Sequence, residues 1–104
     1  MKKTLMQAKD IANKTLDELA SKVGDVLILL EEETIERPLV FAFFYQTREY
    51  VNTGDSSTML AGNSPILVNR ISGQVKHSGT ALPVEHYITE MESEIFSTPH
   101  QISS

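Results

Sequence analysis

The chain has 104 residues, of which 40% are apolar, and a formal net charge of −5. These values fit one globular domain rather than a disordered chain. The acidic balance argues against nucleic-acid binding, which depends on a basic surface, and the absence of cysteine excludes disulfides and thiolate metal sites.

The first half of the chain predicts one helix and two strands. Apolar residues recur every three or four positions from Leu5 to Val23, which indicates an amphipathic helix, and Gly24 is placed to end it. Residues 26–30 form a short apolar run that is typical of a buried strand. Residues 39–45 predict a second strand, and the segment between the two strands is interpreted as a hairpin loop.

A long polar connection follows, from residue 46 to residue 64. Connections of this length inside compact domains are uncommon unless they carry function or structure of their own. Asp55 or Ser56 can cap a short helical turn within it, and Gly62 can end that turn. We therefore expect part of this connection to be helical.

The last third of the chain predicts a hairpin and a second helix. Residues 66–69 and 74–78 form the two strands, and Gly73 can adopt the left-handed conformation in the tight turn between them. Gly79 lies in the next turn, and Pro83 suits the first position of a helix. The apolar stripe of that helix comprises Val84, Ile88, Met91 and Ile95.

This order of elements predicts an α+β fold, in which the N-terminal and C-terminal helices pack on one face of an antiparallel sheet of about four strands. One alternate set of side chains in residues 39–45 would face the helices, and the other set would be partly covered or exposed. We expect residues 1–96 to form a single domain and residues 97–104 to form a flexible tail.

Two observations bear on localisation. The apolar runs at residues 26–30 and 39–45 are far shorter than the ~20 residues of a membrane-spanning helix. Polar residues from Gln7 onward interrupt the N-terminal segment, so we expect no export signal. The sequence therefore predicts a soluble, cytoplasmic protein without a membrane partner.

The sequence assembles no catalytic or metal-binding motif. The three histidines, His77, His86 and His100, are scattered, and none lies in a nucleophile motif. His86 and Glu90 lie one helical turn apart, as in half of a zinc site, but no third ligand is evident from the sequence. We therefore expect no enzyme, no cofactor and no metal.

An ordered set of short elements in the C-terminal two thirds of the chain resembles the YrhB-like family, also known as immunity protein 35 of bacterial polymorphic toxin systems. The elements are Arg48-Glu49-Tyr50, Thr53-Gly54-Asp55, Leu60-Ala61-Gly62-Asn63 with Pro65, Ser72-Gly73, Gly79-Thr80-Ala81, and Pro83-Val84-Glu85 with Tyr87. The chain departs from the family at Phe41, near which a tryptophan is usual, and at Ser64, which stands in place of a glycine.

The resemblance implies a bacterial immunity protein that neutralises a cognate toxin by occluding its active site. It implies a protein toxin as partner, with a papain-like peptidase as one possibility, and leaves the oligomeric state open. The alternative is a small, stable chaperone-like or housekeeping binding protein of the YrhB type. A toxin gene beside the gene for this chain would favour the first function.

Phe41, a group of polar residues and a group of acidic residues are candidates for contact with the partner. Tyrosine and arginine are favoured at interfaces and acidic side chains can steer a basic partner, but the polar residues can equally stabilise their own loop, and the acidic residues can form a solvated turn. The candidates are Phe41, Arg48, Glu49, Tyr50, Asp55, Glu31, Glu32 and Glu33. The residues expected to shape turns are Gly62, Asn63, Gly73 and Gly79.

Overall fold

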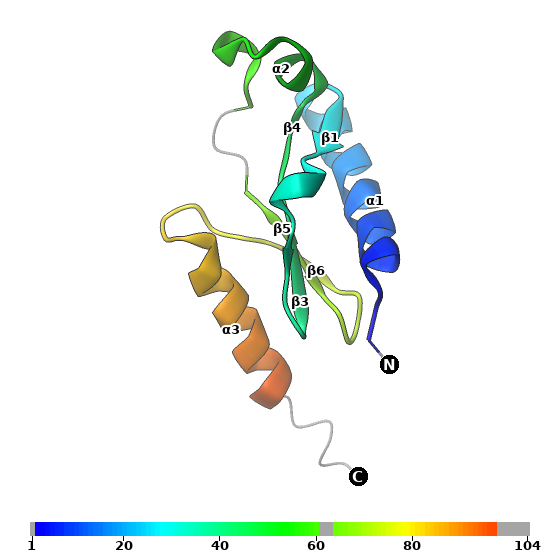
Figure 1. The fold of residues 1–104 in the computed structure, drawn as a ribbon, viewed down its shortest axis with the longest axis vertical. Helices are drawn as coiled ribbons and strands as arrows, with labels where there is room; N and C mark the ends of the chain where they lie inside the picture. Colours follow the sequence, from blue (N-terminus) through cyan, green and yellow to red (C-terminus); the bar gives the residue numbers. More distant parts are fainter. Residues whose placement is uncertain (1, 61–63, 98–104) are drawn as a thin grey trace.

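A computed structural model describes residues 2–60 and 64–97 and has an α+β fold, which confirms the predicted class (Figure 1). The helices are α1 (Leu5–Val23), α2 (Arg48–Thr53) and α3 (Val84–Ser97), with short 3-10 turns η1 (Glu31–Glu33) and η2 (Ser56–Thr58). The strands are β1 (Leu27–Leu29), β2 (Ile35–Glu36), β3 (Val40–Phe43), β4 (Tyr45–Thr47), β5 (Ile66–Asn69) and β6 (Val75–His77).

Helix α1 begins and ends at local signals in the sequence. Thr4 and Gln7 form a reciprocal capping box at its N-terminus, and Gly24 ends it with a φ of 78° in the left-handed region. Its buried residues, Ala8, Ala12 and Leu16, lie four positions apart on one face. That stripe fixes which side of the helix meets the sheet.

The first predicted hairpin is present, but it is divided between two sheets. β1 pairs with β4, and β2 pairs with β3, both antiparallel. Between the two pairs the chain forms η1, and Leu30 N–H donates to the Phe44 carbonyl at 2.8 Å. The strand predicted over residues 39–45 is therefore wrong as one continuous element, because the inserted turn on one arm forces a break at Phe44 on the other.

The four-stranded sheet has the order β2-β3-β5-β6, with every neighbouring pair antiparallel. Its two faces bury separate apolar clusters. Ala8, Ala12 and Leu16 of α1 pack with one cluster, which includes Phe41 and Phe43 of β3. The second cluster joins strand residues to α3, and its fully or nearly buried members are Val40, Ala42, Leu67, Ile88 and Met91.

The placement of both helices on one face is therefore wrong, because α1 and α3 cover opposite faces of the sheet (Figure 1). Successive side chains of a strand point to opposite faces, and β3 is apolar at every position. Both of its faces need cover, and one helix can supply only one of them. The predicted tail falls outside the described residues except for Ser97, the last residue of α3.

Two glycines have a structural reason for lacking a side chain. Gly73 has a φ of 80°, and its N–H donates to the Asn69 carbonyl at 2.7 Å in the β5–β6 turn. A Cβ on Gly79 would lie 2.5 Å from Oη of Tyr87, so the tyrosine ring occupies the space of a side chain there. Gly62 and Asn63 lie outside the described residues.

Replacing Gly73 by valine should lower the free energy of unfolding by about 1–3 kcal/mol, because a β-branched residue is strained at positive φ. Chemical denaturation of the purified variant measures this change. Gly73→Asn is the matched control, since asparagine tolerates the left-handed region, and it should lose less stability than the valine variant. Equal stability of wild type and Gly73→Val would contradict this geometry of the turn.

Candidate functional site

The long connection is anchored on β4 by the side chain of Gln46. Its Nε2 donates to the Leu60 carbonyl at 3.2 Å, and its Oε1 accepts from the Leu60 N–H at 2.8 Å. Gln46 is buried, so these two bonds replace water at both ends of its amide. Sequence reasoning missed this residue, although a polar side chain directly after an apolar run was a usable signal.

Thr47 is the second anchor, and it too was missed. It is the N-cap of α2, where its Oγ1 accepts from the Tyr50 N–H at 3.1 Å. The same hydroxyl donates to the Thr58 carbonyl at 2.8 Å. One buried hydroxyl therefore starts α2 and holds the end of η2 against β4.

Asp55 acts within the connection itself. Its Oδ1 accepts from the Ser57 N–H at 3.0 Å and from the Ser57 hydroxyl at 2.8 Å, which caps η2. These hydrogen bonds from Ser57 hold the pKa of the Asp55 carboxyl below its ordinary value. The helical part of the connection also begins earlier than expected, at Arg48 rather than at residue 55 or 56.

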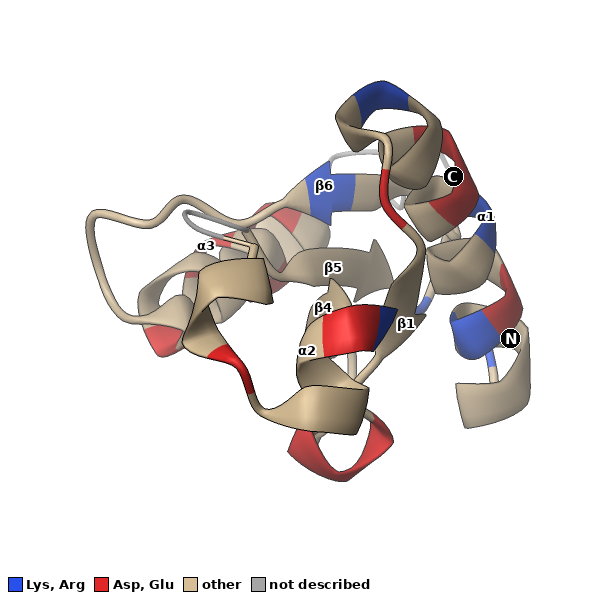
Figure 2. Ribbon diagram, turned by 90° about the horizontal axis from the view of Figure 1, so that it is seen from above, with Lys and Arg blue, Asp and Glu red and all other residues tan. Residues whose placement is uncertain are grey.

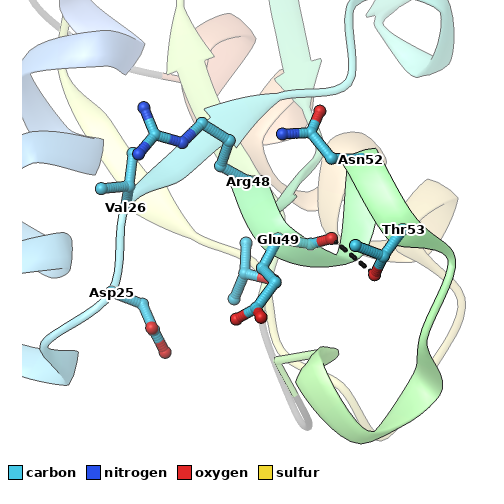
Figure 3. A pocket seen from close by; sticks show the side chains of 7 residues that line it. Asp25, Val26, Arg48, Glu49, Asn52 and Thr53 are labelled. Atoms are coloured by element: carbon cyan, nitrogen blue, oxygen red, sulfur yellow. Dashed lines mark hydrogen bonds between the residues drawn. The ribbon is translucent and has the colours of Figure 1, made fainter.

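A hollow of about 350 Å³ opens beside α2 (Figure 3). It is lined by Asp25, Val26, Thr47, Arg48, Glu49, Asn52 and Thr53. Arg48 and Glu49 are exposed, and within the described part of the chain their side chains form no hydrogen bond or ion pair. Figure 3 shows Arg48 directed toward Val26, with the carboxylates of Asp25 and Glu49 on the other side of the hollow. The hollow therefore offers charges of both signs to a partner.

The acidic turn, defined as Glu31, Glu32 and Glu33, lies at the opposite end of β1 from α2. All three side chains are exposed, and Figure 2 shows the turn as a red segment projecting from the molecule. Glu31 pairs with Lys9 of α1 at 2.9 Å, an exposed ion pair that contributes little to stability. The polar candidates thus form two groups separated by the length of β1.

Phe41 does not belong to either group. Its side chain is fully buried against α1, and the guanidinium of Arg70 lies 4.2 Å from its ring centroid. Its candidacy as a partner contact is therefore wrong, because no surface of the ring is accessible in this fold. Tyr50 is half-buried at the base of α2, where its backbone N–H serves the cap.

The structure also places the histidines and carboxylates that were considered for chemistry. His77 lies on β6 and His86 on α3, where His86 Nε2 is 3.6 Å from Glu90. Over residues 2–60 and 64–97, no three histidine or acidic side chains come together in a way that could hold a metal ion. In the same ranges, no helix has the length and apolar character needed to cross a membrane.

The molecule is a small α+β protein in which hydrogen bonds from Gln46 and Thr47 anchor the polar connection to strand β4. The chain belongs to the immunity protein 35 family, whose model matches residues 6–90. It is also 40% identical over 50 residues to the uncharacterized protein YrhB of Escherichia coli (strain K12). That match covers 48% of this chain and 53% of YrhB, so the chain spans about half the length of this curated relative. No solved structure matches the chain.

Proposed function

We propose that this protein is an immunity protein that binds a cognate protein toxin and neutralises it without chemistry of its own. The observation that carries the proposal is membership of the immunity protein 35 family over residues 6–90. A papain-like peptidase remains the toxin class to test first.

The mechanism we propose is steric. A protein that buries ~800 Å² of its own surface in a standard interface can cover the active-site cleft of an enzyme and exclude its substrate. Arg48, Glu49 and the hollow beside α2 are proposed as one part of the contact, because these exposed charged groups have no partner within the described residues. Gln46 and Thr47 support this surface from below, which limits the ordering cost of binding.

Expression of the toxin encoded beside this gene, with and without this chain, tests the function. We expect the toxin alone to stop growth, the chain to restore it, and the purified proteins to form a complex. A peptidase assay with the purified toxin then shows whether binding blocks the active site. A gene neighbourhood without a toxin, or a neighbouring toxin against which the chain gives no protection, would contradict the proposal and favour a housekeeping binding protein of the YrhB type.

The acidic turn is expected to act on the rate of association. Changing Glu31, Glu32 and Glu33 to glutamine should slow binding to a basic toxin several-fold at low salt and flatten its salt dependence, because long-range attraction is screened over a Debye length of ~8 Å at physiological ionic strength. The dissociation rate should change little, since rim charges contribute little once the complex has formed. Surface plasmon resonance at two salt concentrations measures both rates.

The control for this variant removes the same charge elsewhere, through Asp17→Asn, Glu18→Gln and Glu85→Gln. These side chains are exposed and lie on α1 and α3. The control should slow association less than the acidic-turn variant does. Equal effects of the two variants would mean that only net charge matters, and a much faster dissociation of the acidic-turn variant would place the turn inside the contact.

A further inference from the structure

Strand β6 forms one edge of the four-stranded sheet. Asn69 N–H donates to the Gln74 carbonyl at 2.9 Å, which marks a hydrogen-bonded pair at the start of the β5–β6 ladder. Such pairs alternate with non-bonded pairs in an antiparallel ladder, so Lys76 bonds to β5. Val75 and His77 therefore direct their N–H and C=O groups away from β5, and within the described residues these groups have no backbone partner.

The opposite edge of the sheet is blunted. β2 has only two residues, Ile35–Glu36, and Pro38 follows it without an N–H group. The N–H of Thr34, just before β2, is already bonded to the Glu31 carbonyl at 3.2 Å. Short edge strands and prolines are the usual means of preventing strand addition. Edge β6 is also short, with three residues and Lys76 at its centre, but it carries no proline and, within the described residues, no internal backbone partner for its outward groups.

A second hollow, of about 170 Å³, lies beside β6 on the face covered by α3. Its lining combines polar residues of β5, β6 and the turn between them with two apolar residues and one acidic residue of α3: Asn69, Gln74, Lys76, Met91, Glu94 and Ile95. Lys76 spans the hollow, with Nζ 3.4 Å from a carboxylate oxygen of Glu94. A strand laid along β6 would alternate its side chains, so every second one would point toward this hollow.

From these two features we propose that β6 is a docking edge, which takes an extended segment of a partner protein as an added strand. The outward groups of Val75 and His77 would bond to the partner backbone, and an apolar partner side chain opposite Lys76 would enter the hollow toward Met91 and Ile95. Backbone bonds supply affinity and the hollow supplies selectivity in this mode of recognition. The inference rests on the proposed function, because it takes the toxin as the partner.

Charge argues against a second copy of this chain as the occupant. Two β6 edges that bonded antiparallel through Val75 and His77 would place Lys76 directly opposite Lys76 of the other copy. Like charges facing each other across a strand pair are destabilising. A partner segment with an apolar residue at that position avoids this repulsion.

The variant His77→Pro tests the docking edge. It removes an outward N–H and leaves the bonds of the β5–β6 ladder in place, so the melting temperature should stay near that of the wild type. Binding of the toxin encoded beside the gene, measured by calorimetry, should weaken about tenfold or more, because one lost backbone bond and a displaced strand are worth about that factor.

The matched control is Glu36→Pro on the blunted edge. Arg37 N–H bonds to the Val40 carbonyl at 2.9 Å, so Glu36 lies in a non-bonded pair and its N–H also points outward. This variant should bind the toxin as the wild type does. Hydrogen exchange adds a measurement that needs no variant: the Val75 and His77 amides should become protected when the toxin is bound.

The outcomes separate the two proposals. A wild-type chain that neither binds the toxin nor protects cells overturns the proposed function, and the docking edge with it. Wild-type binding with unprotected Val75 and His77 amides, or with undiminished affinity of a folded His77→Pro variant, overturns the docking edge alone. If the free wild-type protein dimerises and the His77→Pro variant does not, the edge binds a second copy of the chain, and the proposed toxin-docking edge is overturned.

Discussion

Replacing Phe41 by alanine is expected to lower the free energy of unfolding by about 3–5 kcal/mol, the usual cost of truncating a buried aromatic residue. The ring is fully buried among residues of α1 and β5, and Phe43 packs 5.8 Å away between ring centroids. Urea denaturation followed by circular dichroism measures the change. Such a loss would be a large fraction of the ~5–15 kcal/mol that stabilises a typical domain.

The control for this prediction is Phe96→Ala. Phe96 is 74% exposed near the end of α3, so the same substitution there should change stability by only about 0.5 kcal/mol. Phe41→Leu should lie between the two, because it keeps most of the apolar volume. A Phe41→Ala variant with wild-type stability but without toxin binding would mean that Phe41 contacts the partner and is not a core residue.

Replacing Arg70 by methionine should cost about 2–4 kcal/mol, because this side chain joins three parts of the fold. Its guanidinium donates to the carbonyls of Arg37 at 2.7 Å and Lys3 at 3.2 Å, and it covers the ring of Phe41. The side chain is only 13% exposed, so water cannot easily replace these bonds. Thermal and chemical denaturation of the variant measure the loss.

Two further variants serve as comparisons. One tests whether the charge of Arg70 alone accounts for its contribution to stability, and the other removes an exposed ion pair elsewhere. Arg70→Lys keeps the charge but lacks the planar fork that reaches two carbonyls at once. Its stability should therefore lie between that of Arg70→Met and that of the wild type. Lys9→Met breaks the exposed ion pair with Glu31 and should cost less than about 1 kcal/mol. A loss as small for Arg70→Met as for Lys9→Met would mean that the bonds of Arg70 are readily replaced.

The elements that were correctly predicted have their causes within a few residues. The periodic apolar residues and the glycine after Val23 set the bounds of α1, and the second hairpin has Gly73 in the left-handed conformation. Both depend on backbone preference and side-chain spacing, which tertiary contacts did not override here. The family was also recognisable at this level, from short elements of the sequence, and the family model matches residues 6–90.

The candidate site could be predicted only in part from the sequence. Arg48 and Glu49 were selected by residue type, but their position at a hollow with Asp25 depends on the pairing of β1 with β4. The roles of Gln46 and Thr47 depend on bonds to Leu60 and Thr58, which are more than ten residues away in the chain. No local pattern specifies such partners.

The sequence by itself determined the α+β class, the two long helices, the second hairpin and the family. Only the tertiary structure decided that α1 and α3 cover opposite faces of the sheet, that the first hairpin splits at Phe44, and that Phe41 lies in the core. The physical reason lies in β3, which is apolar on both faces and so shows no preference for either helix. Which helix covers which face depends on packing between segments that are distant in the chain. The spacing of residues along one strand does not indicate that packing.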